Sequence, residues 1–184
     1  MAVTDSNKVE LGSKAPDFSL LDVTTGQTKT LSDFKSKKGT VIMFICNHCP
    51  YVKHVQIELV LLAKDYQTKG VSFVAINSND AQNYPDDSPE KMKEEAKKKA
   101  YPFSYLFDET QEVAKKYDAA CTPDFYIYDQ DLRLVYHGQL DDSRPGSGKP
   151  VTGKDMRQAL DNLLSNQPVQ ANQKPSQGCN IKWK

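Results

Sequence analysis

The segment from residue 40 to residue 52, TVIMFICNHCPYV, decides the fold. Residues 40–45 form a continuous apolar run, which is typical of a strand buried on both faces of a sheet. Cys46 and Cys49 follow, and then Pro50, which is tolerated in the first turn of a helix because its missing N–H would have no partner there. The segment therefore predicts a buried strand that leads into a helix, with two cysteines at the junction.

The residues after Pro50 have the spacing of a helix that packs on one side. Apolar side chains recur at intervals of three and four and make one stripe, formed by Val52, Val55, Leu59, Leu62 and Tyr66. Gly70 ends this helix, and residues 71–76 (VSFVAI) predict a second buried strand.

The rest of the chain continues the alternation of strands and helices. Ser88 and Pro89 begin a charged helix that reaches about Ala100. Asp108 is placed to cap a short helix, with Gln111 completing the capping pattern. Further elements are expected at residues 28–31 (a strand), 124–128 and 132–137 (a hairpin), and 154–164 (a helix). This order predicts an α/β fold, with parallel strands joined by helices and an antiparallel edge.

Length and composition bound the class of protein. The 184 residues suggest one domain, which we place at residues 11–165 between a leader (1–10) and a polar C-terminal tail (166–184). The chain has 24 Lys and Arg residues and 24 Asp and Glu residues, so its net charge does not favour binding to nucleic acid or to an anionic membrane. The first ten residues lack the apolar stretch of a secretory signal, and we expect a cytoplasmic protein.

Several short motifs occur in a fixed order along the chain. They are APDFSL (15–20), LSDF (31–34), CNHCPYV (46–52), AINSND (75–80), FDE (107–109), Thr122-Pro123, DDSRP (141–145) and GCNIKW (178–183). With these motifs, residues 11–165 resemble the thioredoxin superfamily. The resemblance is closer to the redoxin branch of alkyl hydroperoxide reductase and thiol-specific antioxidant type, and closest to the peroxiredoxin-like thioredoxin family proteins. It implies a thioredoxin-like fold, with a central mixed sheet flanked by helices.

The resemblance also implies where the reactive cysteine lies. Counting from Phe44, Cys49 occupies the place of the first cysteine of the thioredoxin motif, and Val52 occupies the place of the second. Pro123 takes the place of the cis-proline that faces the active cysteine, and Thr122 would offer its backbone to an extended thiol substrate. Peroxiredoxins carry a threonine where this chain has Cys46 and an arginine where it has Pro123, so efficient peroxidase activity is not expected.

Physical chemistry independently favours Cys49 as the nucleophile. Backbone N–H groups and the helix dipole at a helix N-terminus stabilise a thiolate, and His48 and Lys53 add positive charge nearby. Cys46 continues an apolar run and has no such help. The alternative for either residue is a passive buried thiol, and the spacing also permits a Cys46–Cys49 disulfide.

The other two cysteines are candidates for resolving an oxidised Cys49. Cys121 precedes Thr122-Pro123 and either lies close to Cys49 or points into the core. Cys179 is either a resolving thiol that folds back onto Cys49 or a packing residue that anchors the tail. We slightly favour packing, because Ile181 and Trp183 beside it are large apolar groups that favour burial.

The leading hypothesis is a thiol–disulfide oxidoreductase or redox-responsive protein that uses Cys49 as its nucleophile. The alternatives are a weak thiol peroxidase and a redox-inactive peptide-binding module. Expected substrate-binding residues are His48, Pro50, Tyr51, Thr122 and Pro123. Expected partners are thiols, disulfides and possible peroxides, with a thioredoxin-type reductant. No cofactor is expected, nor a metal, since Cys-x-His-Cys is not a standard zinc spacing. We interpret His54 as a surface residue.

Overall fold

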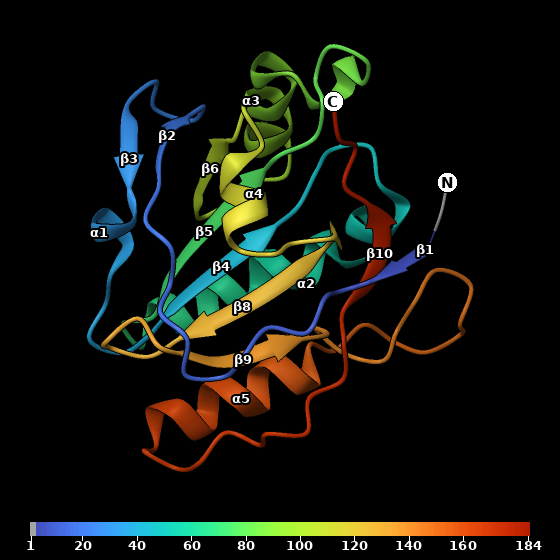
Figure 1. The fold of residues 1–184 in the computed structure, drawn as a ribbon. Helices are drawn as coiled ribbons and strands as arrows, with labels where there is room; N and C mark the ends of the chain where they lie inside the picture. Colours follow the sequence, from blue (N-terminus) through green and yellow to red (C-terminus); the bar gives the residue numbers. More distant parts are fainter. Residues whose placement is uncertain (1–2) are drawn as a thin grey trace.

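The computed structural model describes residues 3–184, which form two sheets and five α-helices (Figure 1). The strands are β1 (Val3–Asp5), β2 (Ser19–Asp22), β3 (Thr28–Thr30), β4 (Thr40–Phe44), β5 (Ser72–Asn77), β6 (Ser104–Phe107), β7 (Cys121–Thr122), β8 (Asp124–Tyr128), β9 (Leu134–Gly138) and β10 (Gln177–Asn180). The helices are α1 (Leu31–Phe34), α2 (Pro50–Gln67), α3 (Pro89–Lys98), α4 (Glu112–Lys116) and α5 (Lys154–Leu164), and a 3-10 turn spans Pro85–Asp87.

The central sheet has seven strands in the order β3-β2-β6-β5-β4-β8-β9. Strands β4, β5 and β6 are parallel, while β8 and β9 on one side and β2 and β3 on the other run antiparallel to their neighbours. The predicted mixed sheet with helices on its faces is therefore confirmed, and both edges of the sheet are antiparallel.

Each face of the central sheet is covered by its own apolar core. Alternate residues of β4 point to opposite faces: Val41 and Met43 pack with α2, α3 and α5, whereas Ile42 and Phe44 pack with α1 and α4. Every residue of β4 is buried, as the apolar run predicts. The stripe on α2 is also confirmed, since all five of its predicted apolar side chains are buried.

The two ends of the chain form a second, three-stranded sheet. Its order is β1-β10-β7, and both pairings are antiparallel. Figure 1 shows β1 and β10 side by side near the start of α2. Residues 3–5 of the leader and residues 177–180 of the tail therefore pair with each other. Ile181 is fully buried as expected, but Trp183 is 42% exposed.

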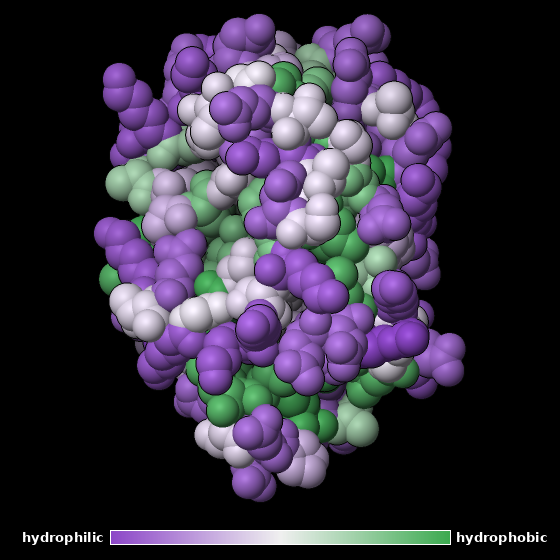
Figure 2. Space-filling view, turned by 90° about the vertical axis from the view of Figure 1, so that its left-hand side faces the viewer, coloured by the Kyte–Doolittle hydropathy of each residue, from purple (hydrophilic) through white to green (hydrophobic). Residues whose placement is uncertain are grey.

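Figure 2 shows the face at the β3 end of the central sheet, where hydrophilic side chains cover most of the surface and hydrophobic ones show between them. Within residues 3–184, no helix is long and apolar enough to cross a membrane.

Candidate active site

Cys49 lies at the N-cap of α2, directly before Pro50 at the first helical position. It follows the carboxyl end of β4, and its side chain is completely buried. The carbonyl oxygen of Cys49 accepts hydrogen bonds from the backbone N–H groups of Val52 (3.1 Å) and Lys53 (3.0 Å), which start the helix. Helix α2 therefore begins directly after Cys49, as predicted from the sequence. Val52, one turn later, occupies the position where the thioredoxin motif has its second cysteine, so there is no thiol at that position.

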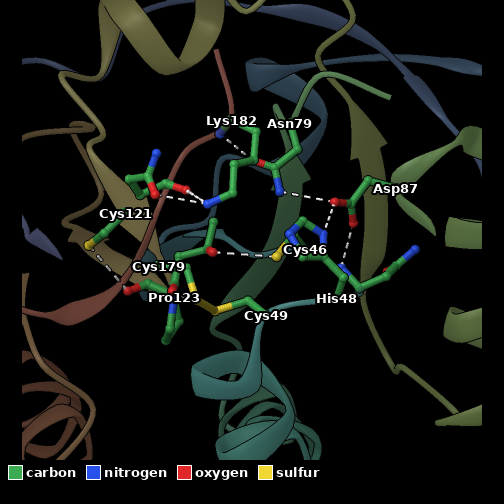
Figure 3. Close-up of a disulfide and its surroundings, with 12 residues drawn as sticks. Cys46, His48, Cys49, Asn79, Asp87, Cys121, Pro123, Cys179 and Lys182 are labelled. Carbon is green, nitrogen blue, oxygen red and sulfur yellow. Dashed lines mark hydrogen bonds and ion pairs between the residues drawn. A yellow bond between two sulfur atoms is a disulfide. The ribbon is translucent and has the colours of Figure 1, made fainter. Parts of the chain in front are cut away.

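The partner of Cys49 is Cys179, on β10. The two cysteines form a disulfide with a Cα–Cα distance of 6.3 Å and a sequence separation of 130 residues. Figure 3 shows this bond, with Cys46 and the His48–Asp87 pair on one side and Cys121 on the other. Cys179 is thus bonded directly to the predicted nucleophile, which the slightly favoured packing interpretation did not anticipate.

The cis peptide bond Thr122-Pro123 lies against this disulfide. The Cys49 sulfur is 3.4 Å from the carbonyl oxygen of Thr122, and both Thr122 and Pro123 are buried. Strand β7, which contains Thr122, pairs with β10 so that Cys179 lies opposite Thr122. The backbone expected to receive an extended thiol substrate is therefore paired with the chain's own tail.

Cys46 is a free, fully buried thiol. Its sulfur lies 3.4 Å from the hydroxyl oxygen of Thr122. Burial and, to a smaller extent, the Asp87 carboxylate raise the pKa of the Cys46 thiol to about 11, and hydrogen bonds from Thr122 and the backbone only partly oppose this rise. Cys46 is consequently a protonated thiol at neutral pH, and the disulfide with Cys49 that the spacing permitted is not formed.

Cys121 is also a free, buried thiol. Burial raises its pKa, and the carboxylates of Asp124 and Asp5 add to the shift. Its sulfur lies 3.7 Å from the carbonyl oxygen of Pro123. Neither free thiol is therefore in the electrostatic setting of an attacking thiolate.

Asp87 completes the site and was missed in the sequence. Its carboxylate accepts hydrogen bonds from the backbone N–H of Asn47 (2.7 Å) and the side chain of Asn79 (3.0 Å), and it bonds Nδ1 of His48. The His48 ring in turn stacks on Tyr84. Asn79 follows the carboxyl end of β5. Polar side chains at that end of β5 lie beside the side chains that follow β4. A polar residue directly after a buried strand is therefore the sequence signal that could have identified the Asp87 loop.

Among residues 3–184, one group of side chains could hold a metal ion. The ligand atoms of Cys46, His48 and Asp87 all lie within 4.8 Å of one another. The carboxylate of Asp87 already accepts hydrogen bonds on both oxygens, and Cys46 contacts Thr122, so these atoms have partners within the protein.

The remaining predicted residues lie around the disulfide. Pro50 is exposed and Tyr51 half-buried, and Tyr51 lines a small cavity together with His54, Pro123 and Arg144. His54 was interpreted as a surface residue, but it is half-buried and its Nε2 lies 2.7 Å from the hydroxyl of Ser143. The DDSRP motif is thereby joined to the start of α2.

Comparison with known proteins identifies relatives along most of the chain. The AhpC/TSA family matches residues 11–137. An uncharacterized conserved protein from Geobacillus kaustophilus is 65% identical, with a TM-score of 0.99 over 100% of this chain and 97% of the other. A hypothetical protein from Sinorhizobium meliloti is 50% identical, with a TM-score of 0.96 over 98% of each chain. Among curated proteins, none matches the chain.

More distant structures share the fold alone. A putative thiol:disulfide interchange protein DsbE from Chlorobium tepidum is 19% identical, with a TM-score of 0.68 over 85% of this chain and 99% of the other. The thioredoxin domain of a thiol-disulfide oxidoreductase from Bacteroides vulgatus is 18% identical, with a TM-score of 0.60 over 71% of this chain and 89% of that domain. These likenesses confirm the predicted thioredoxin-like fold.

Proposed function

The chain belongs to the AhpC/TSA family, and from that membership we propose that it is a thiol–disulfide oxidoreductase with Cys49 and Cys179 as its redox pair. The single observation that carries the proposal is the disulfide between these residues at the N-terminus of α2, beside Thr122-Pro123. Thiols and disulfides are the substrates of this chemistry. A thioredoxin-type reductant and a location in the cytoplasm belong to the proposal.

The reaction runs through two exchanges in which the protein dithiol is oxidised. The Cys49 thiolate, stabilised by the N-terminus of α2, attacks one sulfur of a substrate disulfide and forms a mixed disulfide. The other substrate sulfur leaves as a thiolate and takes up a proton. The thiolate of Cys179 then attacks the sulfur of Cys49, forms the Cys49–Cys179 bond and releases the second substrate thiol. Two electrons pass to the substrate, and an external dithiol returns them to the protein.

In this proposal the two remaining cysteines, Cys46 and Cys121, have a structural part. Cys46 and Cys121 are buried thiols whose pKa values are raised by burial, so they contribute little thiolate near neutral pH. We place them in the packing of the site rather than in the exchange. This assignment separates them from Cys49 and Cys179 in an experiment.

The test is turnover of a model disulfide with dithiothreitol as the electron donor, measured for four single serine variants. We expect Cys49→Ser to lower turnover by more than about 1,000-fold, as loss of a nucleophile does. Cys179→Ser should stop at a mixed disulfide on Cys49, which mass spectrometry detects. Cys46→Ser and Cys121→Ser are the matched controls and should keep turnover within about threefold, since neither group acts in the exchange.

Two outcomes would redirect the proposal. If Cys49 stays unmodified by disulfides and by peroxide, the chain is a peptide-binding module that does not use thiol chemistry. If peroxide oxidises Cys49 to a sulfenic acid that Cys179 resolves, and turnover with peroxide exceeds that with disulfides, the peroxidase alternative replaces the oxidoreductase.

A further inference from the structure

The tail occupies β7 in the manner of an extended thiol peptide. Residues 177–180 run antiparallel to β7, with Cys179 opposite Thr122 and Asn180 opposite Cys121. On one side of Cys179, the hydroxyl of Ser176 donates to the carbonyl oxygen of Pro123 (2.6 Å). On the other side, the N–H of Ile181 donates to the carbonyl oxygen of Ala120 (3.1 Å). The disulfide to Cys49 lies between these contacts, so the tail has the form of a mixed disulfide with an extended peptide.

The residue before the tail cysteine must be glycine. A Cβ atom on Gly178 would lie 1.9 Å from the carbonyl oxygen of Thr122 and 2.6 Å from its carbonyl carbon. It would also lie 3.1 Å from Cδ of Pro123. These are backbone and ring atoms next to the disulfide, and they cannot rotate away as a flexible side chain could. Gly178 does not have a positive φ, so the requirement comes from close approach and not from backbone conformation.

The residue after the tail cysteine meets no comparable restriction. Asn180 is half-buried, and its side chain bonds the carbonyl oxygen of Ile181 and the ammonium group of Lys182, both within the tail itself. A replacement peptide could make or lose such contacts within itself, without involving β7. Selection by the site therefore acts at the position before the cysteine.

We propose that the reduced protein binds extended peptides along β7 and selects substrates whose reactive cysteine is preceded by glycine. The inference rests on the proposed function, because the substrate must form its mixed disulfide with Cys49 at this place. Cys49 bonds the peptide sulfur, and the other half of the substrate disulfide leaves as a thiolate and is protonated. The peptide then separates from β7 while it is still bonded to Cys49, and the tail returns to β7. Cys179 loses its proton and bonds Cys49, and the peptide leaves as a thiolate that takes up a proton.

The test compares two peptides on the full-length Cys179→Ser protein, which stops after the first exchange. The peptides are Ser-Gln-Gly-Cys-Asn-Ile, which copies residues 176–181, and Ser-Gln-Ala-Cys-Asn-Ile, each activated as a mixed disulfide with thionitrobenzoate. Release of thionitrobenzoate gives the rate of reaction with Cys49. We expect the glycine peptide to react at least about tenfold faster, the scale of a steric overlap in a packed site. The serine-bearing tail competes equally with both peptides and leaves the ratio unchanged.

The outcomes separate this inference from the function on which it rests. Dithiothreitol should react with both peptides at one rate, which shows that their intrinsic reactivities match. If the protein reacts rapidly with both peptides alike, Cys49 is a nucleophile but selection for glycine is wrong. If neither peptide reacts, Cys49 is not a nucleophile, and the proposed function fails together with the selection.

A second variant tests the same contact within the chain. In full-length Gly178→Ala protein equilibrated with reduced and oxidised dithiothreitol, the equilibrium constant for closing the Cys49–Cys179 disulfide should fall at least about tenfold. Gln177→Ala is the matched control, because Gln177 precedes Gly178 on β10 and its side chain bonds Asp5. A Gly178→Ala protein that closes its disulfide as readily as the control would overturn the steric argument.

Discussion

Asp87 is a fully buried carboxylate whose charge is held by directed hydrogen bonds. One oxygen accepts from the backbone N–H of Asn47 and the amide of Asn77, and the other accepts from the amide of Asn79 and bonds His48. Burial by itself would raise the pKa of Asp87. The hydrogen bonds from His48, Asn47 and Asn79 outweigh burial and lower the pKa below its ordinary value. The folded protein therefore favours the ionised form.

This lowered pKa makes folding stability depend on pH in a defined direction. Because the folded-state pKa lies below the unfolded value of about 4, the ionised carboxylate stabilises the native state above that pH, and the contribution is lost as the pH falls through the folded-state pKa. Asp87→Asn should lower the free energy of unfolding at neutral pH by about 2–4 kcal/mol, because buried donors lose their charged acceptor. Its stability should also vary less below about pH 5 than that of the wild type.

Urea unfolding across the acid range measures both effects. Asp86→Asn is the matched control, since it removes the same charge from an exposed neighbour and should change stability by less than about 0.5 kcal/mol. Equal acid dependence in the wild type and Asp87→Asn would show that Asp87 does not carry the pH response.

At the scale of helices and strands, an element can be predicted from the sequence when the contacts that stabilise it lie within its own segment. Strand β4 and helix α2 could be predicted because their apolar patterns repeat within one segment, and each pattern alone determines which side is buried. Strand β10 has the sequence QGCN, which carries no alternation and no β-branched residue. It is a strand because β1 and β7 hydrogen-bond to its two edges from more than 50 residues away. No local pattern encodes such pairing.

We expect the disulfide to help hold β10 in place, which gives a prediction on hydrogen exchange. On reduction, the backbone amides of residues 177–180 and of Val3–Asp5 should both exchange hydrogen for deuterium faster. They should do so together because, in the part of the chain that the structure describes, β1 pairs only with β10. Amides of β4 and β5 should keep their protection, since those strands lie inside the central sheet. Hydrogen-exchange mass spectrometry of oxidised and reduced protein measures the difference. Unchanged protection of β10 would mean that its backbone pairing holds the tail without the sulfur bond.

At the scale of the whole molecule, the candidate site was only half predictable. Cys49 could be identified because a helix N-terminus and its preceding strand are adjacent in sequence. Its bond to Cys179 could not, because four cysteines permit several pairings and the choice depends on where the tail lies in the folded chain. Asp87 was missed for the same reason: its loop follows another strand, and only the parallel order of β4 and β5 brings it to Cys46 and His48.

The disulfide also links the stability of the whole chain to its redox state. It joins residues 130 apart, and closing a loop of that length removes enough entropy from the unfolded chain to stabilise the native state by about 5 kcal/mol in the chain-entropy account. We expect reduction to lower the free energy of unfolding by about 3–5 kcal/mol. Urea unfolding of the oxidised wild type, the reduced wild type and Cys179→Ser tests this, and the last two should agree within about 1 kcal/mol because both lack the bond. If reduction lowers the free energy of unfolding by less than about 1 kcal/mol, the predicted dependence of stability on redox state is wrong. The unfolded chain would then retain contacts that already hold the tail near α2.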